Sequence, residues 1–256
     1  MSEHVSVEIR EGVLRLGLNR PEKKNALTRE MYSVLADALE RGRSDSAVRV
    51  VLMHGVEGCF TSGNDLKDFL ANPATDESSP VVKFLHRICE FPKPIVAAVS
   101  GLAIGIGTTL LLHCDLVYAG EDARFQMPFV NLGLCPEGGS SFLLPRLAGY
   151  HKAAELLLLG ESFTAKEARE IGLVNRVVGA SEVLSRGSEA AARLAALPPE
   201  AVGVTKALLK QGTQGETRRV MDEELELFGE RLRSPEAKEA VTAFFEKRKP
   251  DFSKFD

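Results

Sequence analysis

The sequence predicts an α/β fold in which helices cover a sheet. The 256 residues allow one large domain, or one domain with an appendage. Strand and helix patterns alternate along the first half of the chain. The second predicted strand, at 48–53, is a continuous apolar run, which is typical of a strand that is covered on both faces.

The chain begins with a predicted hairpin. Apolar residues alternate over 5–18 around Glu11-Gly12, which indicates two strands with one buried face. Thr28 then caps a helix that has one apolar face. The pattern repeats in this order: the strand at 48–53, a polar loop at 72–80, a helix at 81–90, a strand at 95–99, a helix from Thr108, and a strand at 116–118.

Beyond Tyr150 the sequence predicts helices alone. Thr164 and Glu167 have the spacing of a capping box, which begins one of them. After two successive prolines the pattern stays helical to the end of the chain. We therefore expect a core at 1–197 and a helical region at 198–256.

The last predicted helix has the clearest start. Ser234 is its expected N-cap, and Pro235 takes the first helical position. One apolar stripe is expected on it: Ala237, Ala240, Val241, Phe244 and Phe245. The two phenylalanines suit either the core or a contact between subunits.

Composition excludes several protein classes. The chain is 44% hydrophobic and 27% charged, as in ordinary globular proteins. A net charge of −4 gives no electrostatic footprint for nucleic acid. The acidic, alternating start of the chain lacks a signal or transit peptide, so we expect a cytoplasmic protein. The four cysteines lack the spacing of a metal site or a disulfide framework, so we expect reduced thiols and no metal.

One stretch, 95–112, is uncharged and contains a GxxxG match, as a membrane span can. A buried strand, a glycine turn and a buried helix would give the same pattern. Because the stretch also holds serine, threonines and three glycines, we expect this second arrangement and no membrane partner.

Several catalytic templates are absent from the sequence. It has no G-x-S-x-G elbow, no H-E-x-x-H motif and no Walker loop. The five histidines are scattered singly, and a structural role is expected for each. Chemistry must therefore rest on backbone groups and carboxylates.

Two turns that follow apolar strands lead into helices, one at 61–65 and one at 105–108. Free amides at such turns carry positive potential, and two converging turns would form an oxyanion hole. The alternative is that Asp65 caps its helix and that the glycines allow tight packing.

Glu137 is a single carboxylate among apolar residues and glycines at 128–142. Burial would raise its pKa toward the range of a general base. A solvated glutamate in a turn is the alternative.

Short segments along nearly the whole chain match one family. They are Asn19-Arg20-Pro21, Asn25-Ala26-Leu27, 60–66, Cys114-Asp115 and 245–249. The chain thus resembles the enoyl-CoA hydratase/isomerase superfamily. The segments 62–66 and 136–141 are most similar to peroxisomal-type Δ3,Δ2-enoyl-CoA isomerases. The resemblance implies the crotonase fold, a ClpP-like spiral of ββα units, with a C-terminal helical trimerisation region.

The resemblance also implies a catalytic site. Asn64 and Ile106 would hold the thioester oxygen with backbone N–H groups, and Glu137 would be the base. Hydratases of the family use two glutamates, at the positions that are Thr109 and Phe129 here. Hydration is therefore not favoured, whereas one base suffices to move a double bond.

Substrate contacts are implied by the same resemblance. No separate cofactor is expected, because coenzyme A is part of the substrate. Lys247 would reach a phosphate on a neighbouring subunit's ligand in a homotrimer or a dimer of trimers. For each lysine, a solvated surface charge is the alternative. The other implied contacts are Lys24, Ala26, Leu27, Ser62, Gly63, Asp65, Leu66, Lys67, Gly105 and Phe129.

The sequence therefore predicts an enoyl-CoA isomerase of fatty acid metabolism and β-oxidation. It would shift a 3-enoyl-CoA double bond to the 2-enoyl position through an enolate held in an oxyanion hole. Two alternatives remain: a hydratase or other acyl-CoA enzyme of the same fold, and a noncatalytic acyl-CoA binding scaffold.

Overall fold

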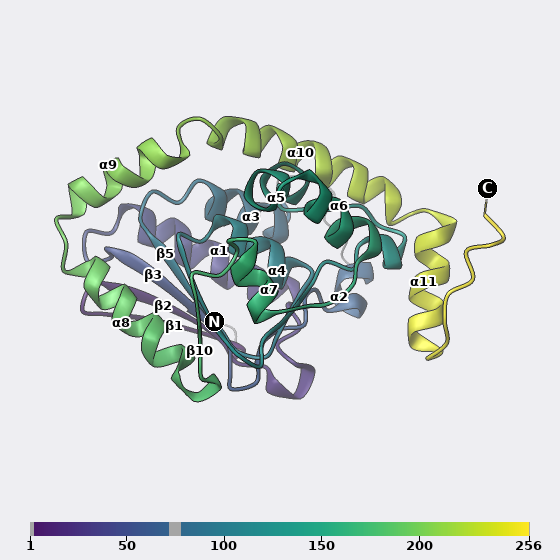
Figure 1. The fold of residues 1–256 in the computed structure, drawn as a ribbon, viewed down its shortest axis with the longest axis horizontal. Helices are drawn as coiled ribbons and strands as arrows, with labels where there is room; N and C mark the ends of the chain where they lie inside the picture. The colour runs from purple at the N-terminus through teal and green to yellow at the C-terminus, as the bar shows by residue number, and fades with distance from the viewer. Residues whose placement is uncertain (1–2, 72–77, 256) are drawn as a thin grey trace.

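A computed structural model describes residues 3–71 and 78–255. The expected polar loop at 72–80 lies largely outside these residues. The chain has the predicted α/β fold, with a six-stranded sheet and a four-stranded sheet among its described residues (Figure 1).

The six-stranded sheet contains every strand that the sequence predicts. The first two strands form the expected antiparallel hairpin, and the other neighbours are parallel. Its strands, in spatial order, are β1 (Val5–Arg10), β2 (Val13–Leu18), β3 (Val50–His54), β5 (Ile95–Val99), β7 (Leu116–Gly120) and β10 (Arg176–Val178).

Both faces of β3 are buried, which explains its continuous apolar run. In the edge strand β1, by contrast, Val7 and Ile9 are exposed, so the buried face expected for this strand is not formed. Val51 and Met53 pack on the side of α1 (Arg29–Ser44) and α3 (Pro80–Cys89). Val50 and Leu52 face the opposite side, where α8 (Val183–Ala195) packs. Successive side chains of a strand point to opposite faces, so both must be apolar here.

The four-stranded sheet was not predicted. It consists of β4 (Cys59–Thr61), β6 (Leu102–Ile104), β8 (Arg124–Gln126) and β9 (Phe163–Thr164), in that order. Strands of two or three residues are too short to show a periodicity, and each pairs with a strand distant in the sequence. The expectation of helices alone beyond Tyr150 is therefore wrong, because β9 and β10 follow it.

The predicted helix starts are largely correct. The side chains of Thr28 and Ser234 each accept a hydrogen bond from the amide three residues further along the chain. The Thr164–Glu167 capping box is also formed. The helix expected from Thr108 begins at Ile106. The other α-helices are α2 (Leu66–Ala71), α4 (Ile106–Thr109), α5 (Ser140–Ala148), α6 (Tyr150–Leu159), α7 (Ala165–Glu170), α9 (Pro199–Lys210), α10 (Gln214–Arg231) and α11 (Pro235–Phe245).

Short 3-10 helices complete the described fold: η1 (Pro21–Lys23), η2 (Leu110–His113), η3 (Val130–Leu132) and η4 (Ala180–Glu182). The uncharged stretch 95–112 forms β5, β6, α4 and part of η2, as its second interpretation requires. Across residues 3–71 and 78–255, none of the helices combines the length and apolar character that a membrane crossing needs.

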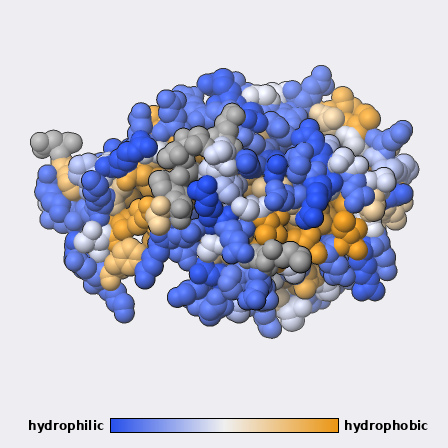
Figure 2. Space-filling model, turned by 180° about the vertical axis from the view of Figure 1, so that it is seen from behind, coloured by the Kyte–Doolittle hydropathy of each residue, from blue (hydrophilic) through white to orange (hydrophobic). Residues whose placement is uncertain are grey.

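In Figure 1, α9 and α10 form an arc along one side of the molecule, and α11 stands at its end. Only part of the predicted apolar stripe of α11 is buried. Ala237 and Ala240 are buried, whereas Phe244 and Phe245 are 58% and 46% exposed. Hydrophobic surface is visible at the α11 side, on the left of Figure 2. Within this chain, the two phenylalanines are therefore not core residues.

The chain is not helical to its end, contrary to the sequence prediction. After α11 it folds back, and Glu239 holds the returning segment. The Glu239 carboxylate accepts hydrogen bonds from Arg248 at 2.5 Å, from the Asp251 amide at 3.0 Å and from Lys254 at 2.9 Å. Hydrogen bonds of this kind, between residues of an irregular segment, leave no periodic pattern in the sequence.

Candidate active site

The two predicted turns meet at one edge of the four-stranded sheet. They follow β4 and β6, which are parallel neighbours, so their carboxyl ends lie together. A Cβ on Gly63 would lie 2.8 Å from the carbonyl oxygen of Ile104, and one on Gly107 would lie 2.6 Å from the Thr61 methyl group. The glycines are thus needed for close contact between the turns.

Each turn leaves a backbone N–H group without a partner. The carbonyl of Gly63 and the amide of Asp65 bond to Leu27, at 2.8 and 2.9 Å. The Asn64 amide between them has no acceptor within residues 3–71 and 78–255. Ile106 is the first residue of α4, so its amide has no hydrogen-bond acceptor within the helix. The arrangement suits an oxyanion hole.

Tyr32 fixes the side chain of Asn64. Its hydroxyl donates a hydrogen bond to Asn64 Oδ1 over 2.5 Å, and its ring packs on Phe84 at 5.5 Å between centroids. Burial, together with the charge of Glu137, raises the pKa of Tyr32 well above its usual value. Tyr32 is not among the site residues predicted from the sequence. Its signal was a tyrosine among apolar helix residues, where a buried hydroxyl needs a partner.

Glu137 lies beside the same turns and is 6% exposed. The Thr109 hydroxyl donates to its Oε1 over 2.5 Å. Thr109 is the last residue of α4, the helix that begins with Ile106. Burial raises the pKa of Glu137 to about 8, against the Thr109 hydrogen bond, which lowers it. The alternative of a solvated turn glutamate is therefore wrong.

Two glycines in left-handed conformation follow the glutamate. Gly138 and Gly139 have φ of 69° and 73°, where other residues are strained. His113 donates from Nε2 to the Gly138 carbonyl over 2.7 Å. Burial lowers the pKa of His113 to about 4, so this imidazole is neutral near physiological pH. Its role in the described structure is to hold the turn, as expected for single histidines.

Asp65 caps its helix, as the alternative interpretation of this turn predicts. Its carboxylate accepts from Arg20 over 2.8 Å and from the amides of Lys67 and Asp68 at 3.1 and 3.2 Å, which caps α2. Burial alone would raise the pKa of Asp65, but these hydrogen bonds lower it overall. Asp65 supports the turn that holds the Asn64 amide.

The structure brings most of the other predicted contacts to this site. The carbonyl of Lys24 accepts from the Ser62 amide over 3.0 Å, while the lysine side chain is exposed. The Ala26 carbonyl accepts from Arg20 over 2.9 Å. Gly105, with φ of 57°, has no heavy atom within 4 Å of the position that a Cβ would take. Open space thus lies in front of this turn.

Two of the predicted lysines lie apart from Glu137, near the end of α11. The Lys67 ammonium is 5.8 Å from the centroid of the Phe245 ring. Lys247 follows the helix in left-handed conformation, with φ of 56°, and is exposed. In this chain neither lysine belongs to the buried part of the site.

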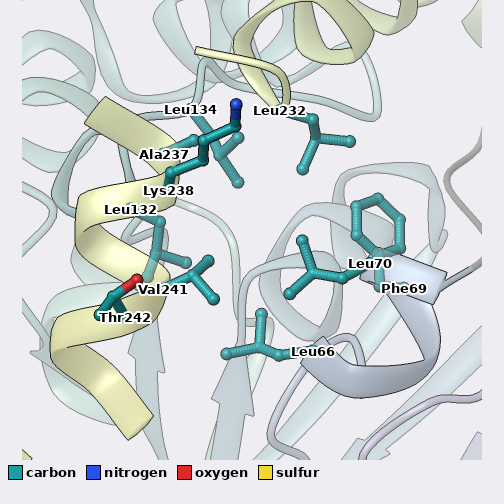
Figure 3. A pocket seen from close by; sticks show the side chains of 10 residues that line it. All are labelled: Leu66, Phe69, Leu70, Leu132, Leu134, Leu232, Ala237, Lys238, Val241 and Thr242. Atoms are coloured by element: carbon teal, nitrogen blue, oxygen red, sulfur yellow. The ribbon is translucent and has the colours of Figure 1, made fainter. Parts of the chain in front are cut away.

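An apolar cavity of about 210 Å³ lies between α2 and α11 (Figure 3). Its wall includes Leu134, three residues before Glu137. Beneath α2, the ring of Phe228 lies edge-on to Phe69 and Phe129, at 5.9 and 6.4 Å. The side chains that line the cavity are Leu66, Phe69, Leu70, Leu132, Leu134, Leu232, Ala237, Lys238, Val241 and Thr242.

The four cysteines are free, as predicted, and two of them, Cys59 and Cys89, are buried. In the part of the chain that the structure describes, histidine, cysteine and acidic side chains do not gather in threes as metal ligands would.

Comparison with known proteins identifies relatives along almost the whole chain. The family model described as enoyl-CoA hydratase/isomerase matches residues 8–254. The chain is 36% identical to the 1,2-epoxyphenylacetyl-CoA isomerase of Escherichia coli (strain K12), over 99% of both chains. It is 35% identical to enoyl-CoA delta isomerase 2 of Rattus norvegicus, over 97% of this chain and 65% of that protein.

Solved structures give the same result. The structure of Pseudomonas aeruginosa OdaA is 54% identical, with a TM-score of 0.93, over 95% of this chain and 99% of that one. Hydratase names also occur among relatives at 34% identity, including a probable enoyl-CoA hydratase of Bacillus subtilis (strain 168) that matches over 97% of this chain and 98% of that protein. The names of these curated relatives all include coenzyme A, but they indicate several reactions.

Proposed function

The chain belongs to the enoyl-CoA hydratase/isomerase family, and we propose that it is an isomerase that moves the double bond of a 3-enoyl-CoA to the 2-enoyl position. Glu137 removes the proton from carbon 2 of the acyl group and returns it to carbon 4. The negative charge of the dienolate falls on the thioester oxygen. The amides of Asn64 and Ile106 donate to that oxygen, and one such donor is typically worth about 3 to 4 kcal/mol.

The observation that carries the proposal is that, among residues 3–71 and 78–255, Glu137 has no second carboxylate that is free to act with it. Thr109 stands at one position where hydratases have a glutamate, and its hydroxyl proton is engaged by Glu137. Phe129 stands at the other and packs on Phe228. Adding water needs a group that orients and deprotonates water and a second proton donor, whereas a double-bond shift needs only one base.

Glu224 is a second buried carboxylate near this site, but its oxygens are occupied. They accept from the amides of Gly139 and Ser141, at 2.6 and 2.9 Å. The carboxylate is therefore not free to activate water. This supports the assignment of one base and, with it, isomerisation over hydration.

The surroundings of the site suit an acyl thioester. The apolar cavity beside α2 offers room for part of an acyl chain, because its wall is almost entirely hydrocarbon. The exposed cations of Lys24, Lys67 and Lys247 suit the phosphates of coenzyme A as point charges. Coenzyme A arrives as part of the substrate, so we propose no separate cofactor.

We also propose that residues 198–256 form an oligomerisation region of a homotrimer or a dimer of trimers. The exposed Phe244 and Phe245 support this, because large apolar side chains at the end of a terminal helix are suited to burial by another subunit. In such an assembly Lys247 would reach a ligand of the neighbouring subunit.

The test is a parallel assay on one preparation. Isomerisation of a 3-enoyl-CoA and hydration of a 2-enoyl-CoA are measured at matched concentrations. We expect isomerase turnover to exceed hydratase turnover by at least about tenfold, a barrier difference of about 1.4 kcal/mol. Comparable or inverted rates would make the protein a hydratase. If neither acyl-CoA is consumed but both bind, the chain is a binding scaffold.

A further inference from the structure

Helix α10 presents a buried carboxylate to the turn that carries Glu137. Glu224 is 5% exposed. Its Oε2 accepts from the Gly139 amide over 2.6 Å, and its Oε1 accepts from the Ser141 amide over 2.9 Å. These amides belong to the start of α5, where unpaired N–H groups favour an anion. Both oxygens of this carboxylate therefore hold one short segment.

The backbone of that segment is shaped for contact with α10. A Cβ on Gly139 would lie 3.0 Å from the Thr217 methyl group and 3.1 Å from Met221 Cγ. Only a glycine allows α10 to come this close without displacement. On the opposite side, His113 donates to the Gly138 carbonyl. The turn after Glu137 is therefore held between η2 and α10.

We propose that Glu224 is a positioning residue for Glu137, and that it fixes the segment 138–141 and thereby the place of the base relative to the Asn64 and Ile106 amides. The proposal rests on the proposed function, in which Glu137 is the base. Glu224 acts through the turn and does not touch the substrate. A displacement of about 1 Å in a catalytic group can cost a hundredfold in rate, so such support matters.

The positioning role of Glu224 can be tested through the pKa of Glu137. The titratable groups that interact with it are the Tyr32 phenol from α1, the Cys135 thiol from its own loop and Glu224 from α10. The Thr109 hydroxyl is not titratable. Burial is the main cause of the raised pKa of Glu137, and the charge of Glu224 raises it further.

Besides the two amides, the Ser141 hydroxyl donates a hydrogen bond to Glu224. The titratable neighbours of Glu224 are the exposed Glu223 on the same helix, Glu137 and the Cys135 thiol. Removal of the Glu224 charge should therefore lower the pKa of Glu137. Water admitted by a loosened turn would also lower it, because burial is the main cause of the raised pKa. A variant that keeps the charge at position 224 is therefore needed to separate the two effects.

Three variants test the proposal. Glu224→Gln removes the charge and leaves a single acceptor for two amides. Glu224→Asp keeps the charge but is shorter by one methylene, so it loses reach. Glu226→Gln removes a charge from an exposed position of the same helix and is the matched control.

We expect Glu224→Gln to lower kcat for isomerisation at least about tenfold, with KM within about twofold, because position and not binding is affected. The acidic limb of its pH–rate profile should move to lower pH. Glu224→Asp should lose kcat with the limb at the wild-type pH. Glu226→Gln should match wild type in both.

Two results would overturn the proposal: a kcat for Glu224→Gln within twofold of wild type, or an acidic limb that does not move. If Glu224→Gln does not fold by circular dichroism, Glu224→Asp decides, and full kcat in that variant overturns the proposal. Failure of the proposed function would be recognised separately, because wild type itself would then be inactive. If wild type does not isomerise, the Glu137 carboxyl is titrated by infrared spectroscopy, with its band assigned by loss in Glu137→Gln. A lower midpoint in Glu224→Gln then supports the proposal, and an unchanged one overturns it.

Discussion

The hydroxyl of Thr109 donates a hydrogen bond to Oε1 of Glu137 over 2.5 Å, in a position where both groups are buried. This contact occupies one carboxyl oxygen and orients the other. In the part of the chain that the structure describes, Oε2 has no hydrogen-bond donor. It is therefore the oxygen that the proposed proton transfer would use.

The first prediction concerns the base. Glu137→Gln keeps the size of the side chain and removes the proton acceptor, so turnover should fall toward the upper part of the range of about 100 to 10,000-fold. Binding of acyl-CoA should remain nearly unchanged, as measured by calorimetry.

Asn64→Ala is the matching variant for the main-chain role. Alanine keeps the amide, so its effect on turnover should be milder than that of Glu137→Gln. It also leaves the Tyr32 hydroxyl without its partner, which should lower stability by about 1 to 3 kcal/mol. If Asn64→Ala abolishes turnover while Glu137→Gln loses less than about tenfold, the proton is carried by another group.

The second prediction is a pH dependence. The pKa of Glu137 is raised to about 8, chiefly by burial. Because a base acts only when deprotonated, kcat/KM should rise with pH and level off above about 8. A profile for the free enzyme that is already flat from pH 5 upward would contradict this pKa.

The same raised pKa should affect folding. Between the pKa of an unfolded glutamate and that of Glu137, the folded state holds the extra proton. The contribution of Glu137 to the free energy of unfolding should therefore decrease as the pH rises through this window. Denaturant titrations should show it as a difference between wild type and Glu137→Gln that changes with pH, because His113 titrates in both proteins and contributes with the opposite sign.

The third prediction separates the hydroxyl of Thr109 from its shape. Thr109→Val removes the hydrogen bond that lowers the pKa of Glu137, so the acidic limb of kcat/KM should move to higher pH. Thr109→Ser keeps the hydroxyl and should retain the wild-type profile. Equal profiles for the two variants would show that the contact does not tune the base.

The fourth prediction uses two glycines on either side of β4. Gly63 and Gly58 both have positive φ, at 91° and 74°. A Cβ on Gly63 meets the Ile104 carbonyl, whereas one on Gly58 meets no atom within 4 Å. Gly63→Ala should therefore lose at least about 1 kcal/mol more stability than Gly58→Ala in denaturant titrations.

The turnover of the two variants should differ in the same direction as their stability. Gly63→Ala moves one amide donor away from the other, so kcat should fall at least about tenfold. Gly58→Ala should keep kcat. An active Gly63→Ala variant would mean that the close approach of the turns is not required.

The fifth prediction is the oligomeric state. With Phe244 and Phe245 exposed on the chain, light scattering should give a mass of three times 27.8 kDa or a multiple of it. Replacement of both phenylalanines by serine should shift the mass toward the single chain. A clean monomer of the wild type at micromolar concentration is the contrary result.

The sequence was informative wherever a signal is local. The hairpin around Glu11-Gly12, the Thr28 and Ser234 caps and the strand at Ile95–Val99 follow from short-range patterns, and the structure confirms them. The candidate site was also reachable, because Glu137 and the two glycine turns stand out in the sequence and in the resemblance.

What the sequence could not supply depends on distant contacts. The strands β4, β6, β8 and β9 are defined by pairing between segments that lie 22 to 43 residues apart. Likewise, the contact between Tyr32 and Asn64 joins α1 to a turn after β4. Glu224 reads as one of several acidic residues on a helix, and only folding shows that it is buried.

One short helix, α4, has a consequence for how the site responds to motion. Its first residue offers the Ile106 amide, and its last offers the Thr109 hydroxyl. Three helical residues advance about 4.5 Å along the axis. The proposed donor to the substrate oxygen and the hydroxyl that orients the proposed base thus lie at the two ends of one short helix. The distance between these two groups is set within α4, so a movement of the helix shifts both together, whereas Glu137 itself is held through its own segment.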